Sequence, residues 1–537
     1  MNKDVLKIRE KFHKLRNKIE KELELNNEQK ILLGELLKHV RNVTVTQVSS
    51  KGDSVTDINE KSNGIAEILY QGDIVLTEQQ AKEIEDDIQN GVSKRSKRQA
   101  YKDYYYPRTI WDKGLYYFFH DSASEKARRA FILGAQMWQK DTCINFYQSS
   151  TASHRVRVIG ADGCWSYVGR LLTTRQQDLS LGSGCEVSGI AAHEIGHALG
   201  FYHTHSRHDR DQFITVNMRN IVYDWRDQFN LESTSTNDNY GIAYDYGSIM
   251  HYGAHSASAK GGLTMVPHDP TFTETLGSYF ISFYELLMMN KHYKCTAICD
   301  SQQSAQCQNG GFPHPRNCMK CICPSGYGGD LCNKRPSGCG EELQAENEPK
   351  TFRNIIGDTS RGQVRRESYD MCTYWIKAPK GSRIEVKIVS LSQGANTDGC
   401  TYWGVEIKTQ EDQKHTGYRF CSPQDKGVTL VSYGNLVPII FYNGFYQTVV
   451  QLQYRIGTRT LGHLICANSL YFKLPVLGLV DLSSQVRKVE MSSQDSRANQ
   501  LAQADQSRQQ ALPALMTEDA STSDAPASAV IDHSRHT

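Results

Sequence analysis

Three histidines and one glutamate near the middle of the chain have the types and spacing of a catalytic metal site. Residues 193–203 read HEIGHALGFYH, so His193 and His197 are four residues apart. On a helix, residues at that spacing lie on one face, and both imidazoles can reach one metal ion. Gly200 permits the left-handed conformation that ends a helix, which allows the chain to turn and bring His203 to the metal. Three histidines leave coordination positions open, as in catalytic zinc sites.

The remaining chemistry falls to Glu194 and to a second motif further along the chain. Glu194 is expected to point at a metal-bound water and to take its proton. In the segment 248–252, SIMHY, Met250 is expected to form a tight turn beneath the histidines, and the Tyr252 phenol can approach the metal or an oxyanion. Together the motifs are the signature of metzincin zinc peptidases. A histidine-rich amphipathic helix and an ordinary core methionine do not explain both.

Longer stretches around both motifs resemble the astacin family of metallopeptidases. The segments 200–211, GFYHTHSRHDRD, and 244–252, YDYGSIMHY, carry the resemblance. It implies one zinc ion per subunit, bound by the three histidines, with Tyr252 as a fifth ligand that swings away to stabilise the transition state. One position departs from the family pattern: Thr204 stands where astacins have a glutamate that contacts the new N-terminus after activation.

The elements that must position this site fall in a unit predicted to span residues 99–298. The aromatic run at 114–119 predicts a strand, and apolar residues at helical spacing predict a helix over 124–140. The resemblance implies an α+β, two-lobed metzincin peptidase with a central active-site helix and a substrate cleft between the lobes. It also implies two disulfides, Cys143–Cys295 and Cys164–Cys185.

Residues 1–98 are predicted to be a propeptide. They lack cysteine and end in KRSKR, a basic run of the type cut by secretory-pathway proprotein convertases. A solvated loop is the alternative, but the position of the run favours cleavage between Arg98 and Gln99. The segment 70–73, YQGD, resembles the astacin propeptide motif, although Gly-Asp is also a common turn. The resemblance implies that Asp73 binds the zinc in place of the catalytic water and keeps a zymogen inactive.

Two cysteine-bearing modules are predicted after the peptidase. Residues 299–333 hold six cysteines in a segment too short for a large core, and they resemble an EGF-like module. A zinc knot is the alternative, but no histidine pattern accompanies the cysteines. Residues 339–456 show the short alternating segments of a β-sandwich and resemble a CUB domain. Spacing alone leaves several connectivities open. The resemblances imply the disulfides Cys299–Cys318, Cys307–Cys321, Cys323–Cys332, Cys339–Cys372 and Cys400–Cys421.

The last segment, 457–537, is predicted to be a disordered tail, and from Ser483 onward it is rich in Ser, Gln, Ala and Asp. Its apolar stretch at 461–482 is interrupted by polar residues and proline, so no membrane anchor is expected. Cys466 is the odd member of fifteen cysteines and could pair between chains.

Composition favours a secreted, extracellular protein. Cysteines confined to residues 143–466 indicate disulfides made in an oxidising compartment rather than reduced cytosolic thiols. A net charge of +2 gives no case for nucleic-acid binding. Residues 1–40 are amphipathic and charged without the apolar region of a signal peptide, so an incomplete N-terminus is expected. Asn42 begins an Asn-Val-Thr tripeptide and is a candidate glycosylation site.

Two functions of different class fit these observations. The first is a secreted zinc endopeptidase, made as a zymogen, that hydrolyses extracellular proteins, with collagen, cuticle or tissue matrix as the suspected substrates. The second is a non-catalytic adhesion or matrix-binding protein that uses the EGF-like and CUB modules. Loss of a zinc ligand or of Glu194 would favour the second function, and the sequence keeps all of them.

Overall fold

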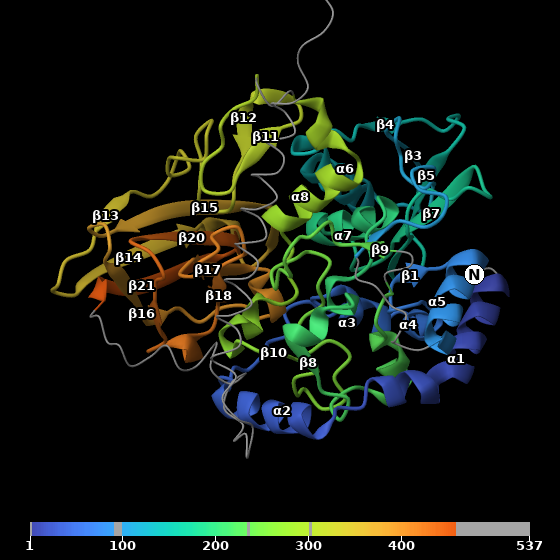
Figure 1. Ribbon diagram of the computed structural model, residues 1–537, viewed down its shortest axis with the longest axis horizontal. Coiled ribbons are helices and arrows are strands. Elements are labelled where there is room, and N and C mark those ends of the chain that lie inside the picture. The colour runs from blue at the N-terminus through green and yellow to red at the C-terminus, as the bar shows by residue number, and fades with distance from the viewer. Residues whose placement is uncertain (1–2, 91–98, 234–236, 300–302, 458–537) are drawn as a thin grey trace, which may run out of the picture. The chain divides into compact units, whose positions relative to one another are not determined.

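The computed structural model of the chain describes residues 3–90, 99–233, 237–299 and 303–457 (Figure 1). The predicted cleavage site after Arg98, the odd cysteine Cys466 and the segment 458–537 lie outside these residues. The described chain has the predicted α+β class: a helix-covered sheet in its first half and a β-sandwich in its second. None of its helices is long and apolar enough to cross a bilayer.

The N-terminal segment consists mainly of short helices. One face of the first helix is buried because its apolar residues recur at spacings of three and four. The second helix begins with a capping box between Asn26 and Gln29, and the chain then runs without regular secondary structure over 41–49. The elements are α1 (Lys3–Glu22), α2 (Asn27–His39), α3 (Val55–Glu60), α4 (Ile65–Ile68), β1 (Ile74–Val75) and α5 (Glu78–Asn90).

The next segment forms a six-stranded sheet that carries helices. The sheet order is β1-β6-β7-β5-β3-β4, and β6 is antiparallel to β7. The edge strand β1 comes from the N-terminal segment and pairs with β6 in parallel. The elements are β2 (Ala100–Tyr101), β3 (Leu115–Phe119), α6 (Glu125–Lys140), β4 (Phe146–Gln148), β5 (Arg155–Ile159), β6 (Cys164–Tyr167), β7 (Gln176–Leu181) and α7 (Ser188–Ala198).

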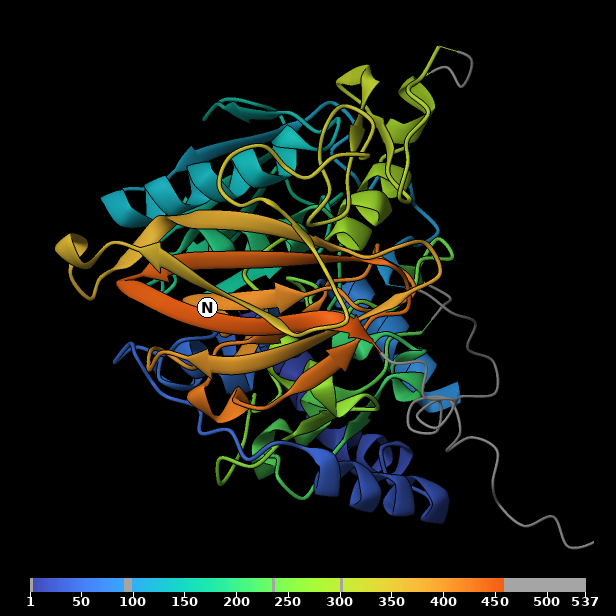
Figure 2. The same ribbon diagram turned by 90° about the vertical axis from the view of Figure 1, so that its left-hand side faces the viewer.

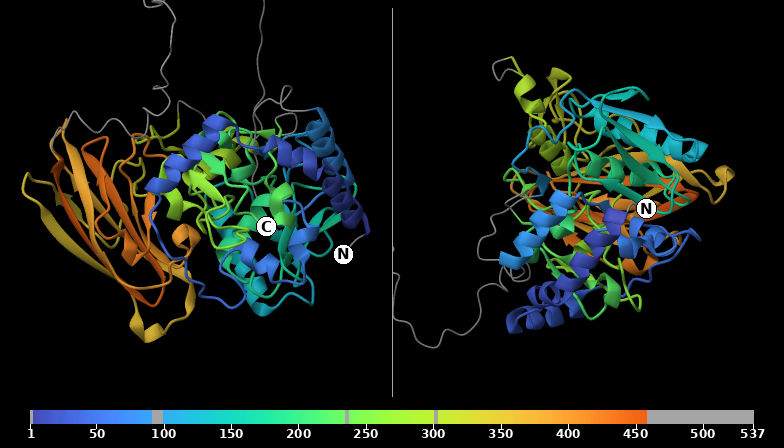
Figure 3. Two further views of the ribbon diagram at one scale, coloured as in Figure 1. Left: turned by 90° about the horizontal axis from the view of Figure 1, so that it is seen from below. Right: turned by 90° about the vertical axis from the view of Figure 1, so that its right-hand side faces the viewer.

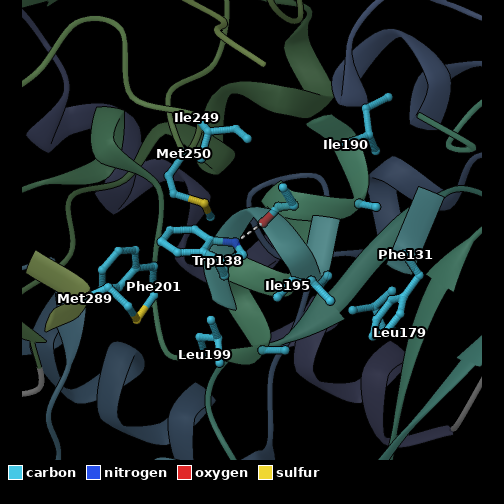
Figure 4. Packing of buried hydrophobic residues seen from close by; sticks show 14 of the residues in the cluster. Phe131, Trp138, Leu179, Ile190, Ile195, Leu199, Phe201, Ile249, Met250 and Met289 are labelled. Carbon is cyan, nitrogen blue, oxygen red and sulfur yellow. Dashed lines mark hydrogen bonds between the residues drawn. The ribbon is translucent and has the colours of Figure 1, made fainter. Parts of the chain in front are cut away.

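Helix α7 carries the histidine motif and is buried along nearly its whole length. It packs against α6, where a Cβ on Gly134 would come within 2.8 Å of the Ala192 backbone nitrogen, so the two helices need glycine at their closest approach. The Trp138 indole of α6 donates to the Ala192 carbonyl at 2.8 Å (Figure 4). These contacts fix the position of the motif helix.

The following part has short strands and 3₁₀ turns, and it ends in one helix. Its regular elements are β8 (Ile214–Val216), β9 (Asn237–Asp238), β10 (Met265–Pro267) and α8 (Phe283–His292). Both disulfides implied for this unit are present, Cys143–Cys295 and Cys164–Cys185. The first joins the chain after α6 to the chain after α8, and so closes the unit on itself.

Two further modules follow. The hairpin module, residues 303–333, contains β11 (Phe312–His314) and β12 (Asn317–Ile322). The sandwich, residues 339–457, consists of two sheets (Figures 2 and 3). Their strand orders are β13-β15-β20-β17-β18 and β14-β21-β16-β19. Its strands are β13 (Glu342–Gln344), β14 (Lys350–Gly357), β15 (Arg365–Lys377), β16 (Arg383–Leu391), β17 (Trp403–Ile407), β18 (Tyr418–Phe420), β19 (Thr429–Val431), β20 (Leu436–Phe445) and β21 (Gln447–Gly457). All five disulfides of this region have the implied pairing: Cys299–Cys318, Cys307–Cys321, Cys323–Cys332, Cys339–Cys372 and Cys400–Cys421.

Candidate zinc centre

Four side chains from two distant segments converge on one point. Helix α7 places His193 and His197 on one face, and Gly200, at φ +112°, lets the chain turn so that His203 joins them. Asp73 lies among the imidazoles: its Oδ2 is 3.1 Å from Nε2 of His193 and 3.2 Å from Nε2 of His203. Its Oδ1 is 3.5 Å from Nε2 of His197. Three imidazole nitrogens and one carboxylate oxygen match the donor set of zinc.

The second nitrogen of each imidazole is already engaged. Each Nδ1 lies next to an oxygen acceptor: His193 next to the Ile249 carbonyl (2.7 Å), His197 next to the Phe201 carbonyl (2.7 Å) and His203 next to the Gln71 carboxamide (2.8 Å). A carbonyl oxygen only accepts, so Nδ1 carries the proton and Nε2 keeps its lone pair. Burial lowers the pKa of His197, and it lowers the pKa of His203 to about 3. Neutral rings with Nε2 facing inward are the form that binds a metal.

Unpaired buried atoms support the same conclusion. Nε2 of His197 and Oδ1 of Asp73 are buried and have no hydrogen-bond partner among the described residues. Leaving a buried polar atom unpaired costs about 1–3 kcal/mol. A zinc ion bound by these atoms removes that cost, so the residues present fit the metal.

The chain around Asp73 is held so that its carboxylate must enter the cluster. Gly72 has φ +84°, and a Cβ there would lie 2.6 Å from the Trp225 ring, so only glycine fits this turn. The Tyr70 hydroxyl donates to the Glu232 carboxylate at 2.6 Å. Gln71 donates to the same carboxylate at 2.8 Å. Tyr70 and Gln71 thus share one buried carboxylate as their acceptor.

Glu194 is fully buried beside the cluster, and both of its carboxylate oxygens lack a partner among the described residues. Burial, and secondly the charge of Asp73, raise the pKa of Glu194 well above its usual range. A carboxyl group with a raised pKa is suited to accept a proton and to return it.

Tyr252 reaches the cluster from the second motif. Its hydroxyl lies 2.8 Å from Oδ2 of Asp73 and 2.5 Å from the Gln71 carbonyl, and it shares its proton between these two acceptors. Burial raises the pKa of Tyr252 well above its usual range, so the phenol keeps its proton. The ring centroid lies 4.4 Å from that of His203, which fixes the hydroxyl next to the metal ligands.

Met250 lies beneath the motif helix and is fully buried. A Cβ on Gly196 would come within 2.7 Å of its sulfur, so the glycine inside the motif makes room for the methionine. The Glu285 carboxylate secures the turn, since it accepts from the backbone nitrogens of Ile249 (3.0 Å) and Met250 (3.1 Å) and from the Ser248 hydroxyl.

Gln99, the expected new N-terminal residue, lies against the position that departs from the family pattern. It is 2% exposed, and its carboxamide donates to the Thr204 hydroxyl at 3.0 Å. That hydroxyl shares a hydrogen bond of 2.6 Å with Ser248. The Tyr101 nitrogen donates to the Gly200 carbonyl at 2.8 Å, so the segment is paired with the chain that follows α7.

The structure brings together the residues that sequence reasoning placed at the metal, and it leaves Asn42 apart from them, in the chain after α2. Sequence reasoning missed Gln71, Gly196, Glu232 and Glu285. Gln71 and Gly196 lie inside the two short motifs at 70–73 and 193–203, so their place in the sequence could have indicated a role at the site. The two glutamates lie in segments without a motif, and only the folded chain shows their contacts.

Comparisons with known proteins give a consistent result. The sequence model of the Astacin family of peptidases matches residues 103–294. "Zinc metalloproteinase nas-31" of Caenorhabditis elegans is 49% identical over 415 residues, which cover 77% of this chain and 67% of that protein. "Zinc metalloproteinase nas-29" of the same organism is 34% identical over 442 residues, covering 78% and 81%.

Among solved structures, the chain is similar to High choriolytic enzyme 1, a hatching enzyme zinc-protease from Oryzias latipes. The two are 29% identical, with a TM-score of 0.32, over 36% of this chain and 94% of that chain.

The donor set, the motif helix and the sequence relationships define a zinc metalloendopeptidase. The chain belongs to the astacin family. The predicted enzyme class and the predicted zinc cofactor are therefore confirmed.

Proposed function

We propose that the chain is a secreted endopeptidase made as a zymogen, in which Asp73 blocks the zinc centre until residues 1–98 are removed. One observation carries the proposal: the Asp73 carboxylate lies 3.1–3.5 Å from Nε2 of all three histidines and accepts from Tyr252. A carboxylate in that position competes with water for the metal and prevents Tyr252 from reaching a substrate.

Each residue of the centre has a role in peptide hydrolysis. His193, His197 and His203 would hold the zinc, and the ion would supply a bound water of lowered pKa and a Lewis acid for the scissile carbonyl. Glu194 takes a proton from the attacking water and gives it to the leaving amine. Tyr252, released from Asp73, donates to the oxyanion. Met250 supports the histidines from below.

The N-terminal segment also covers the edge where a substrate backbone can bind. Strand β1 pairs with β6 through Ile74 and Val75, and β6 has no other partner on that side in the described sheet. An edge strand offers unpaired backbone groups to an extended peptide. Removal of residues 1–98 therefore frees the metal and this edge together.

The rest of the proposal concerns maturation and targets. A proprotein convertase cuts after Arg98, and Asn42 carries a glycan that leaves with the fragment. Residues 299–333 act as an EGF-like module and residues 339–456 as a CUB domain, which direct the enzyme to extracellular protein such as collagen or cuticle. The disulfide pairings support this assignment. Seven disulfides also support an extracellular setting.

The test uses two variants of the full chain, each secreted behind a leader and left uncleaved. Asp73→Ala is expected to hydrolyse a quenched fluorescent peptide without any convertase, in a reaction that a chelator stops. Asp86→Ala, an exposed aspartate on α5, is the matched control and is expected to stay as inactive as wild type. An Asp73→Ala chain that binds zinc yet is no more active than wild type before cleavage, and becomes active no sooner after it, would refute the inhibitory role.

A further inference from the structure

The segment that leaves α2 touches the peptidase and the sandwich at the same time. In Figure 3 (left) the blue chain after α2 runs between the orange sandwich and the green peptidase. The Arg41 guanidinium lies 2.9 Å from the Glu274 carboxylate of the peptidase and 2.9 Å from the Asp425 carboxylate of the sandwich. It also lies over the Phe420 ring, 5.0 Å from its centroid. One propeptide side chain therefore joins two parts of the enzyme.

A few residues further on, the same segment is hydrogen-bonded to the loop before β17. The Thr46 nitrogen donates to the Asn396 carbonyl at 2.7 Å, and the Asn396 nitrogen donates back to the Thr46 hydroxyl at 2.8 Å. The Asn396 carboxamide donates to the Thr44 carbonyl at 2.6 Å. Asn396 is 3% exposed, so these are protected hydrogen bonds.

Asp53 makes the last contact of the series. The Tyr402 hydroxyl of the sandwich donates to its carboxylate at 2.5 Å, and the Tyr279 hydroxyl of the peptidase donates to its carbonyl at 2.6 Å. Asp53 and Tyr402 are 7% and 3% exposed. We call the surface formed by Tyr279, Glu274, Asn396, Tyr402 and Asp425 the seam.

The seam does not depend on the propeptide for its existence. The Arg419 guanidinium of the sandwich donates to the Ser278 hydroxyl at 2.7 Å, and the Tyr418 hydroxyl donates to Asp269 at 2.6 Å. The Thr416 nitrogen and hydroxyl each donate to Asp245 at 3.2 Å. These contacts join the sandwich directly to the peptidase, so the seam stays assembled when the propeptide is absent.

Charge explains why the seam favours an arginine. Glu274 and Asp425 are buried close to each other, and burial together with the neighbouring carboxylate raises the pKa of Glu274 well above its usual range, whereas Arg41 lowers it. Two adjacent buried carboxylates do not both ionise, and the one charge that they carry is poorly solvated without a cation. Arg41 supplies that cation.

We propose that the seam is a second binding site for the propeptide, and that its occupant is residues 41–53 of this chain. The sandwich thereby takes part in inhibition, and this inference rests on the proposed zymogen. Cleavage after Arg98 then does not by itself release the fragment, which stays bound through Asp73 at the zinc centre and through Arg41 to Asp53 at the seam. Release is a separate step, and its rate is set partly by the sandwich.

The experiment uses the full chain, cut by a convertase at neutral pH, with two measurements on the two-chain product. Size-exclusion chromatography followed by mass spectrometry gives the fraction of fragment 1–98 that stays bound, and hydrolysis of a quenched peptide gives the lag before activity. For wild type we expect the fragment to co-elute with the enzyme and activity to rise only as it dissociates.

Variants on both sides of the contact test the seam. Arg41→Ala is expected to speed release roughly thirtyfold, because removing one partner of a buried charge pair costs about 2 kcal/mol or more. Tyr402→Phe, which removes one hydroxyl from the enzyme side, is expected to speed release about tenfold. Lys38→Ala on α2 and Tyr433→Phe on the sandwich change exposed residues and are the matched controls, expected to release at the wild-type rate.

The outcomes separate the seam from the proposed enzyme function. Release at the wild-type rate in both Arg41→Ala and Tyr402→Phe, with normal secretion of each, overturns the inference. So does a wild-type fragment that leaves as soon as it is cut. If neither wild type nor any variant hydrolyses peptide after the fragment has dissociated, the proposed peptidase function fails. Co-elution of the fragment with the enzyme would still show whether the seam binds it.

Discussion

The zinc centre and the seam bind the same N-terminal segment by different means. At the centre, one carboxylate meets three imidazoles that come from eleven consecutive residues, 193–203. At the seam, contacts spread over residues 41–53 meet side chains from 274 to 425, and no two of the enzyme residues are neighbours in sequence. In the proposed zymogen a single carboxylate blocks the centre, whereas binding at the seam depends on the sum of several pairs.

This difference predicts how each region responds to change. A substitution at the zinc centre should alter chemistry in an all-or-none manner, because each ligand or base has a unique role. A substitution at the seam should alter a rate or an affinity by degrees. We expect the largest effect at Glu194 of the zinc centre, a smaller one at Gly196 in the motif helix, and the smallest at His255, which pairs with the sandwich.

Glu194→Gln is expected to lower kcat roughly 10²- to 10⁴-fold while zinc stays bound, because a carboxamide cannot accept the proton of the attacking water. Steady-state kinetics on the matured enzyme and metal analysis of the same sample check this. Glu186→Gln, just before α7, is the matched control. Wild-type turnover in zinc-loaded Glu194→Gln would assign the base to another residue.

Gly196→Ala is expected to destabilise the peptidase by about 1–3 kcal/mol, as overpacking does in a filled core. The added methyl group would meet the Met250 sulfur at 2.7 Å. The midpoint of denaturant unfolding measures the loss, and Gly434→Ala, where no atom lies within 4 Å of the new Cβ, is the control. A double variant, Gly196→Ala with Met250→Ala, should recover part of it. No recovery would mean that the methionine is not the obstacle.

The smallest expected effect is a pH dependence of the contact between sandwich and peptidase. His255 pairs with Asp398 at 2.8 Å, and although burial opposes it, the charge of Asp398 raises the pKa of His255 above 6.5. A raised folded pKa stabilises the protonated form, so the contribution is complete below pH 6.5 and is lost as pH rises through the folded value. Calorimetric melting of wild type and His255→Asn should therefore differ more at a pH about one unit below that value than at a pH about two units above it. An equal difference at both values would contradict the assignment.

The same contrast explains what could be predicted from sequence. The histidine motif, the helix over 124–140 and the Asp73 motif are local, and periodicity or a short resemblance was enough to place them on the right elements. The seam could not be predicted, because Arg41 can form its two ion pairs only after folding has brought Glu274 and Asp425 together. Glu285 is similar: it belongs to an ordinary capping box with Ser282, and only the fold directs its carboxylate to the methionine turn. Cleavage after Arg98 and disorder of the segment after 457 remain predictions, because these residues lie outside the described part of the chain.

The position of Gln99 has a consequence for the order of events. Residues 99–101 already lie in the peptidase, bonded to Thr204 and paired with the chain after α7, while the fragment is still attached. Under the proposed zymogen mechanism, a cut just before Gln99 leaves residues 99–101 where they already lie. We therefore expect activity to begin when the N-terminal fragment departs rather than when the peptide bond is broken.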